Sequence, residues 1–587
     1  MKLRSISAAL VVSGLLLGTS GCKDFFDVNV DPIRPIKAEL QQLLPVTQTA
    51  ASTYLSFSIG GIGQATSALM GQLSSGRGIG TYQQNGDSFG NQWGGLYSEM
   101  LVNNEQIITQ GTTERRWSYV GIAQIQKAYV MSQLVDMFGD VPYSEALKGA
   151  ANLAPRYDKD FDIYNGNAGL GIQSLFSLID EGIANLARTG GATPAQEDLI
   201  YGGDLGKWAR LGRTLKLKLY VQTRKSGADN FRPEITALLA NPSGLMASEP
   251  GNDFEFKYGI SGTPANRNIG FLSDYVDVGR ENSIGRYLYL LMRYRNGVRI
   301  PTGALPVPDP RIPYYFFNQQ PAAVATYSTA IFDFQDIQRP AFITVRQGST
   351  GPASNGVSSN IRTLPGLYPV GGRYDDGRGG NANTTFGRGI VAQRLLPYFS
   401  RKFLEAEAQL VVLNNRAVAL LDLETAVKAS FAKVNAIALA EGSSTPAKAA
   451  APPFVAEVNP AIPPLGVISQ ADINTYINNL KIRYNQASQP LQVIMEEKYI
   501  ASFGMGPDIY TDWRRTGFPI ITVPDNANIG PANVGLIEDG DTETRGAGLF
   551  PRRLFYSQGA LTANPTPAAP KRQLTESDPN YRIFWDK

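Results

Sequence analysis

The single cysteine of this 587-residue chain, Cys22, stands at the end of a short apolar stretch close to the first residue. A basic head precedes an apolar run at residues 8–17 (AALVVSGLLL), and the small residues 19–21 lead into the cysteine. This order is typical of a lipoprotein export signal. The sequence therefore predicts that residues 1–21 are a signal peptide and that the mature, folding chain begins at Cys22.

The length of the apolar run shows what this segment can do. It holds about ten residues, whereas a membrane-spanning helix needs roughly 20. The run therefore targets the chain, and acyl chains on Cys22 would anchor it, since two or more such chains hold a protein firmly on a membrane. The alternative is an ordinary secretory signal followed by a buried or free thiol. Thr19 leaves this alternative open, because lipoprotein signals usually have leucine at that position.

The charge and the missing histidine exclude several classes of protein. Loss of Lys2 and Arg4 with the signal lowers the net charge from +3 to +1, so nothing in the charge indicates a nucleic-acid partner. The chain has no histidine, which excludes Ser-His-Asp and Cys-His nucleophile systems. Zinc is almost excluded as well, and the remaining carboxylates and carbonyls suit calcium or magnesium. We expect no cofactor.

Apolar periodicity predicts a mostly helical protein. We expect helices at residues 117–138, 169–188, 205–225, 397–439 and 471–503, the fourth broken near Asn414-Asn415. Paired helices of this kind suggest tetratricopeptide-like stacking, although no 34-residue repeat is present. Residues 226–396 are instead rich in Gly, Pro, Asn and Tyr, and residues 442–466 form a Pro/Ala-rich insertion that we expect to be a surface loop.

A set of ordered motifs runs through the chain. They are residues 22–32 (CKDFFDVNVDP), 135–147 (VDMFGDVPYSEAL), 198–220 (DLIYGGDLGKWARLGRTLKLKLY), 496–519 (EEKYIASFGMGPDIYTDWRRTGFP) and 551–565 (PRRLFYSQGALTANP), followed by a closing RIFWD. In this order and spacing the sequence resembles the SusD/RagB-like nutrient-binding outer-membrane lipoproteins of Bacteroidota. The resemblance covers the whole mature chain.

This resemblance implies a fold and a role. It implies one domain over residues 22–587, with a tetratricopeptide-like scaffold at about 40–225 and 390–520 and a loop-rich ligand-binding portion at about 226–390. Members are not enzymes; they capture an oligosaccharide or peptide as a lid on a SusC-like TonB-dependent transporter. Lys23-Asp24 is compatible with the acidic signal that sends such lipoproteins to the cell surface.

Two loop stretches have the composition of a glycan or peptide site, which needs aromatic faces flanked by amide, carboxylate and guanidinium groups. Residues 77–97 offer Arg77, Tyr82, Asn91 and Trp93 amid glycines. Residues 368–386 offer Arg373, Tyr374, Asp375, Asp376 and Asn381. For Trp93 two interpretations stay open. It contacts ligand, in which case its loss should weaken binding without a large loss of stability, or it simply packs in the core.

Other prominent residues have structural interpretations. In the motifs we expect Gly139 to end a helix, Tyr143 and Trp208 to pack in the core, and Arg514-Arg515 to tie together loop carbonyls or carboxylates. Two acidic clusters, at residues 375–377 and 538–543, could hold calcium. Neither has the spacing of an EF-hand, so solvated loops are the better interpretation.

Two other functions are compatible with the residues alone. A surface glycoside hydrolase would need only two carboxylates, although no acid pair stands in a recognisable active-site context. A purely helical-repeat scaffold in the periplasm would also explain the export signal and the helices. We expect the surface-binding role because of the motifs.

Overall fold

The computed structural model describes most of the mature chain. The described residues are 38–58, 60–75, 79, 82, 84–277, 280–294, 308–321, 335–336, 339–345, 360–384, 387–441, 466–520, 522–523, 537–538, 551–564 and 581–586. The predicted signal, Cys22, Lys23-Asp24, Arg77 and nearly all of the 442–466 insertion lie outside them.

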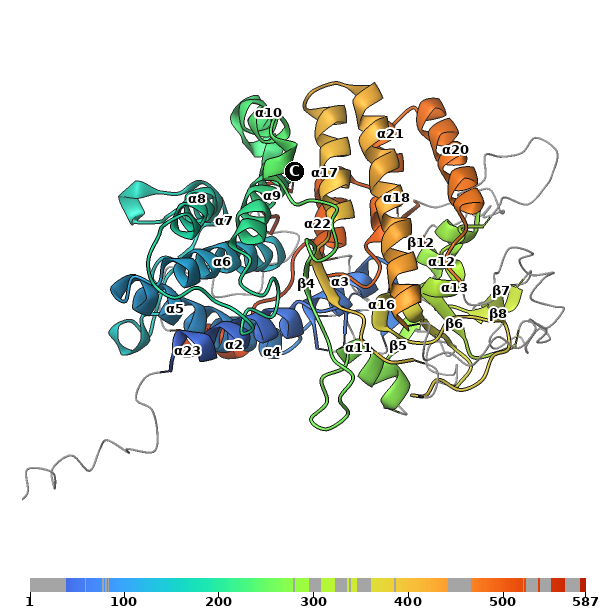
Figure 1. The fold of residues 1–587 in the computed structure, drawn as a ribbon, viewed down its shortest axis with the longest axis horizontal. Coiled ribbons are helices and arrows are strands. Elements are labelled where there is room, and N and C mark those ends of the chain that lie inside the picture. The colour runs from blue at the N-terminus through green and yellow to red at the C-terminus, as the bar shows by residue number, and fades with distance from the viewer. Residues whose placement is uncertain are drawn as a thin grey trace, which may run out of the picture.

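The first half of the chain is a group of packed helices (Figure 1). Its elements are α2 (Leu40–Tyr54), α3 (Ile62–Leu69), α4 (Gly90–Gly95), the π-helix Leu96–Leu101, α5 (Val102–Thr113), α6 (Trp117–Phe138), α7 (Asp160–Asn165), α8 (Leu175–Leu186), α9 (Leu205–Thr223) and α10 (Arg232–Leu239). Successive helices pack as neighbours: α5 on α6, α6 on α8, and α8 on α9. This is the stacking that the sequence predicted.

Local signals decide where these helices begin and end. The predicted helix at 117–138 is confirmed as α6, and Gly139 ends it with a φ of 79°, a conformation that favours glycine. The helix predicted at 169–188 begins six residues later, as α8. Its N-cap is Ser174, whose side chain accepts a hydrogen bond from the Ser177 N–H, while a 3-10 turn and the left-handed Gly171 occupy the residues before it.

A second helical group follows the loop-rich region. It comprises α17 (Tyr398–Val411), α18 (Arg416–Glu441), α20 (Gln470–Gln486), α21 (Pro490–Ala501) and α22 (Asp508–Thr516). The predicted break is confirmed, because Asn414 has a φ of 55°. The prediction of one helix over 471–503 is wrong. Pro490 lacks the N–H that a continuing helix needs, and it starts α21 as a separate helix.

Short strands occur along the chain, and many of them, together with several short helices, lie in the region between the two groups. The strands pair two by two within the described residues: β1 (Leu73–Ser75) with β5 (Asn282–Ile284), β2 (Val141–Pro142) with β3 (Tyr157–Asp158), β4 (Phe254–Phe256) with β10 (Gln393–Leu396), β6 (Phe316–Asn318) with β9 (Thr363–Pro365), β7 (Gln335–Asp336) with β8 (Arg339–Ile343), and β11 (Thr522–Val523) with β12 (Ile537–Glu538). Short helices lie among them: α11 (Ile269–Phe271), the π-helix Leu272–Val276, α12 (Arg286–Tyr294), α13 (Ile312–Tyr315) and α16 (Leu367–Val370).

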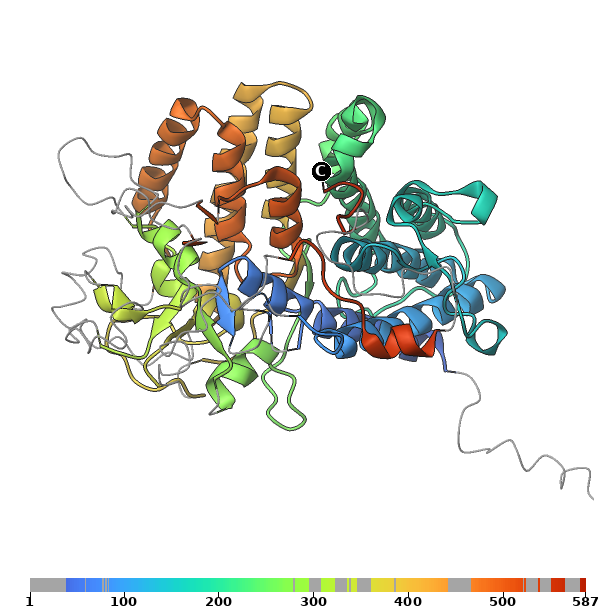
Figure 2. The same cartoon turned by 180° about the vertical axis from the view of Figure 1, so that it is seen from behind.

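The two helical groups and the loop-rich region share one interior. Figures 1 and 2 show α17, α18, α20 and α21 upright beside one another, α5 to α9 on one side of them, and the paired strands β6–β9 below. One large apolar cluster runs from Leu40 in α2 to Leu561 in α23 (Gln558–Ala563). Within the described part of the chain, no helix combines the length and apolar character needed to cross a bilayer.

Candidate ligand-binding surface

The Tyr275 hydroxyl holds the start of the loop that follows α16 by two hydrogen bonds. The Tyr275 hydroxyl donates to the Pro365 carbonyl (2.8 Å) and accepts a hydrogen bond from the Arg373 N–H (3.1 Å). Gly372 lies so close to the Tyr275 ring that a Cβ at this position would overlap it. The start of the predicted 368–386 stretch is therefore held on a rigid support.

Two of the predicted ligand residues in this loop point into the protein. The Arg373 guanidinium lies 4.7 Å from the centroid of the Phe317 ring, and the residue is 8% exposed. Tyr374 is 3% exposed and meets Tyr314 edge to face, with ring centroids 5.0 Å apart. Both side chains thus pack under the loop, and a ligand contact by either stays a prediction.

Asp375 also faces inward, where its neighbours are amide groups. Its carboxylate accepts hydrogen bonds from Asn318 Nδ2 (2.6 Å) and from the Gly377 N–H (3.2 Å). The Asn318 Oδ1 in turn accepts from the Thr363 hydroxyl (2.7 Å). Burial raises the pKa of Asp375 to about 7, more than these hydrogen bonds lower it.

The outer face of the same loop is polar. The Asp376 side chain is 34% exposed and forms ion pairs with Arg373 (3.4 Å) and Arg378 (3.7 Å). Asn381, Asn383 and Thr384 follow as exposed residues. We call residues 376–384 the polar edge. Of the five residues predicted in this stretch, Asp376 and Asn381 belong to it.

Trp93 is a packing residue in the structure. It is 5% exposed and lies in α4 among aromatic rings. Its ring centroid is 5.1 Å from Phe138, 5.7 Å from Tyr556 and 6.2 Å from Tyr157. Its removal is therefore expected to cost stability, because a buried ring with this many aromatic neighbours contributes to the core. A ligand contact by Trp93 stays a prediction.

The other described residues predicted in the 77–97 stretch are less buried than Trp93. Tyr82 is half-buried against the apolar core, and Asn91 is exposed at the start of α4. Arg77 lies outside the described residues. A ligand contact by Tyr82 or Asn91 stays a prediction.

The structure does not bring the two predicted stretches together. In Figures 1 and 2, α4 lies beside α2 and α23 in the first helical group, whereas α16 lies below α18 in the loop-rich region. The fold therefore presents the two stretches as separate candidate surfaces. The polar edge is the better candidate.

The acidic cluster at 375–377 is poorly suited to a cation. Both oxygens of Asp375 accept hydrogen bonds from N–H groups, whose positive ends face the position that a cation would need. Among the described residues, no three carboxylate, cysteine or histidine side chains are gathered as a metal site. Most of the 538–543 cluster lies outside the described residues.

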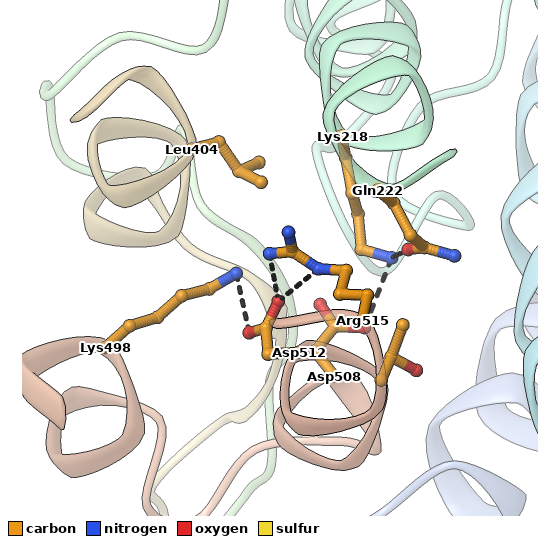
Figure 3. A pocket seen from close by; sticks show the side chains of 8 residues that line it. Lys218, Gln222, Leu404, Lys498, Asp508, Asp512 and Arg515 are labelled. Carbon is orange, nitrogen blue, oxygen red and sulfur yellow. Dashed lines mark hydrogen bonds and ion pairs between the residues drawn. The ribbon is translucent and has the colours of Figure 1, made fainter. Parts of the chain in front are cut away.

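A small polar cavity lies elsewhere, between α9, α17, α21 and α22 (Figure 3). Its volume is about 10 Å3, which is about the space of one water molecule, whereas ligand pockets have roughly 300–1,000 Å3. Charged pairs line it: Lys498 with Asp512 (2.7 Å) and Lys218 with Asp508 (3.2 Å). The cavity therefore lies where four scaffold helices meet, and it is too small for a sugar.

Residues of the 496–519 motif form the ion pairs where these four helices meet. Arg515 donates to Glu407 and Asp512, and Arg224 pairs with the same Glu407 (2.7 Å). Burial alone would raise the pKa of Glu407, but Arg515 and Arg224 outweigh it and lower that pKa. On the other face of α21, Glu497 pairs with Arg311 (3.5 Å), which belongs to the loop-rich region.

The remaining structural predictions for the motifs are confirmed. Arg514 donates to the Asp136 carbonyl (2.6 Å) and the Arg552 carbonyl (3.0 Å), so the arginine pair does tie chain segments together. Trp208 is fully buried, with its indole N–H on Asp198 (2.8 Å), and the Tyr143 ring is 7% exposed.

The comparison with protein families agrees with this arrangement. A family described as SusD-like, "Starch-binding associating with outer membrane", matches residues 41–343 and 394–535, which is most of the chain. This chain belongs to the SusD-like family. No curated protein matches the sequence.

Solved structures share the fold of this SusD-like chain. A SusD/RagB family protein from Bacteroides thetaiotaomicron is 20% identical with a TM-score of 0.66, and the match covers 94% of this chain and 99% of that one. A chitin-binding protein is 20% identical with a TM-score of 0.64, covering 94% and 100%. A SusD homologue from Bacteroides fragilis is 19% identical with a TM-score of 0.59, covering 89% and 94%. At these identities the likeness establishes the fold.

Some residues that shape the SusD-like loop had no sequence signal. Asn318 and Thr363 hold Asp375, but they lie 45 positions apart. They meet because β6 pairs with β9 in a register that sets Asn318 opposite Thr363. Neither residue stands in a motif, so only the pairing of the strands shows their role.

Proposed function

We propose that this SusD-like chain is a lipid-anchored protein of the outer cell surface that binds an oligosaccharide and delivers it to a SusC-like TonB-dependent transporter. The family match, which spans the first helical group, part of the loop-rich region and most of the second helical group, supports binding at the outer membrane. The observation that carries the proposal is the polar edge, residues 376–384, presented by a loop with a rigid support.

The chemistry of the polar edge suits a sugar. Sugar hydroxyls both donate and accept hydrogen bonds, and the edge offers a carboxylate (Asp376), a guanidinium (Arg378), two amides and a hydroxyl. A loop on a rigid scaffold is also the usual place for binding residues. We therefore expect binding without turnover of the ligand.

An array of glycans and peptides tests the proposal on the purified protein. Chitin oligosaccharides belong on it, since one protein of the same fold is described as chitin-binding. For the best ligand, Asn381→Ala should weaken binding several-fold, whereas Asn474→Ala, an exposed asparagine on α20, should leave it unchanged. Equal affinities of the two variants would remove the polar edge as the site. Turnover of a glycan that an acid-to-amide change abolishes would favour a hydrolase.

The anchor and the partner need tests in cells. Cys22→Ala should move the protein from the membrane fraction to the soluble fraction, because the acyl chains would be lost. Protease added to intact cells should remove the wild-type protein, and its survival would indicate a periplasmic location. Purification from detergent-solubilised membranes should bring a TonB-dependent transporter with it; its absence would count against the delivery role.

A further inference from the structure

Two Asn-Gly pairs lie on the surface of the protein. The sequence contains four such pairs, and two of them, Asn85-Gly86 and Asn165-Gly166, fall within the described residues. The first stands in the bend before α4, the second lies at the end of α7, and both asparagine side chains are exposed. Asparagine is a chemically labile residue, and a glycine after it lets the glycine nitrogen approach the side chain, because no Cβ restricts the backbone.

The backbone nitrogen of the glycine is free in the first pair and bound in the second. Within the described residues, the Gly86 N–H donates no hydrogen bond. The Gly166 N–H donates to the Asp162 carbonyl (2.7 Å), which closes the last turn of α7. A nitrogen held in this way has to break its hydrogen bond before it attacks a carbonyl carbon. Of the two glycines, Gly86 is therefore the one whose nitrogen is available.

The side-chain amides of the two asparagines differ in the same direction. Asn165 Nδ2 donates to the Phe161 carbonyl (2.9 Å), which holds the amide along α7. Asn85 Nδ2 donates to no acceptor in the part of the chain that the structure describes. The NH2 group of Asn85 can therefore leave without breaking a hydrogen bond to the protein.

The oxygen of the Asn85 side chain is held by two donors. Asn85 Oδ1 accepts from the Asp87 N–H (2.9 Å) and from the Ser88 hydroxyl (3.3 Å). The bond to Asp87 folds the side chain over the intervening Gly86 peptide group, as asparagine side chains do in turns. Donors at this oxygen also stabilise the negative charge that forms on it when its carbon is attacked.

We propose that Asn85 is a site of spontaneous modification, at which the side-chain amide is lost through a cyclic imide. The Gly86 nitrogen gives its proton to hydroxide and forms a bond to Asn85 Cγ, the Cγ–Nδ2 bond breaks, and Nδ2 takes a proton from water and leaves as ammonia. Water then opens the ring at one of two bonds to the Gly86 nitrogen. Cleavage at Cγ gives aspartate, and cleavage at the backbone carbonyl carbon gives isoaspartate.

Isoaspartate at position 85 would alter a contact with the C-terminal part of the chain. The Gly86 carbonyl accepts from the Gln558 N–H (2.7 Å) at the start of α23. The fit is close, since a Cβ on Gly86 would lie 2.6 Å from the Gln558 Cβ. Isoaspartate adds one methylene carbon to the backbone directly before Gly86, so the hydrogen bond to Gln558 should be lost. The modification therefore weakens the attachment of α23, and it is separate from the ligand role of the polar edge.

Peptide mapping by mass spectrometry tests the proposal on the full protein, incubated at mildly alkaline pH. Asn85 should lose its amide at least about ten-fold faster than Asn165, since each hydrogen bond that must break slows the reaction several-fold. The rate at Asn85 should rise with pH, because hydroxide removes the Gly86 proton. A rate at Asn85 equal to or below the rate at Asn165 would overturn the proposal.

The unfolded chain is the control for geometry. In concentrated urea the hydrogen bonds of both pairs are lost, so Asn85 and Asn165 should react at similar rates. The same ratio of rates in the unfolded as in the folded protein would show that the neighbouring sequence decides the rate, which would contradict the structural argument.

Two variants test the chemistry and its consequence. Ser88→Ala removes one donor from Asn85 Oδ1 and should slow the loss of the amide several-fold; an unchanged rate would contradict the role of the donors. Asn85→Gln should abolish the reaction, because the longer side chain has to close a larger ring. After incubation, hydrogen exchange of residues 558–563 should be faster in the wild type and unchanged in Asn85→Gln. Unchanged exchange in a wild type that carries isoaspartate would contradict the effect on α23.

Discussion

Two buried sites, one around Glu407 and Asp512 in the helical scaffold and one around Asp274 and Asp375 in the loop-rich region, stabilise carboxylates in opposite ways. In the scaffold, Glu407 faces Arg224 and Arg515, and Asp512 faces Lys498 and Arg515. In the loop-rich region, Asp274 and Asp375 face amide groups. Cations lower the pKa of Glu407 and Asp512, whereas burial raises the pKa of Asp274 and Asp375, so one chain contains two kinds of buried acid with different responses to protons.

The pKa directions express this difference. Burial acts against ionisation of Asp512, yet Lys498 and Arg515 outweigh it and lower its pKa to about 2. Its stabilising contribution is therefore present above the ordinary pKa of 3.8 and is lost as the pH falls towards 2. For Asp274, with a pKa raised to about 7, the contribution is present below 3.8 and is lost as the pH rises to 7. Mild acid should thus stabilise the surroundings of Asp274 before it destabilises the ion pairs of Asp512.

The largest effect should come from breaking the scaffold network. Arg515→Met would leave Glu407 buried with Arg224 alone, and Asp512 with Lys498 alone. Removal of one partner from a buried ion pair typically costs about 3–5 kcal/mol, which denaturant unfolding would measure. Lys428→Met is the control, since its pair with Glu424 is exposed and worth under about 1 kcal/mol. Similar losses in both variants would show that the network contributes little.

Trp93 tests whether the scaffold stretch at 77–97 packs or binds. Trp93→Ala should lower the free energy of unfolding by about 3 kcal/mol, because it empties a buried aromatic site. Trp117→Ala is a suitable comparison: this half-buried ring lies under Arg188, 3.2 Å from its guanidinium, and should cost less. A stable Trp93→Ala protein with weakened ligand binding would restore the ligand-contact interpretation.

The contrast between α6 and the two loop stretches shows what a sequence can predict. Helix α6 has apolar residues all along it and a glycine at its end, and both signals act within the segment. The break at Asn414 was equally local, whereas the role of Pro490 as a helix start was missed. Loop composition carries no such information, because Trp93 and Asp376 stand in similar glycine-rich surroundings. Whether each faces in or out depends on distant partners such as Tyr556 and Phe317.

A smaller, pH-dependent effect on stability is expected at Asp274 in the loop-rich region. Asp274→Asn removes a group that must either stay protonated or be charged in the core, so it should raise stability at pH 8 and change it much less at pH 4. Glu407→Gln should do the reverse and destabilise most at pH 8, because its pKa is lowered by Arg515 and Arg224 despite burial. Parallel pH profiles of stability for the two variants would show that the two kinds of buried acid respond alike to protons.

The smallest expected effect comes from comparing an outward residue of the loop, Arg378, with an inward one, Arg373. Arg378→Ala removes an exposed guanidinium whose pair with Asp376 spans 3.7 Å, so the free energy of unfolding should change by less than about 0.5 kcal/mol. Arg373→Ala, five positions earlier, removes the cation over Phe317 and should cost about 1–2 kcal/mol. Equal losses of stability in the two variants would contradict the inward position of Arg373. The inward position of Asp375 would then lose its support as well, because both residues depend on the same packing against β6.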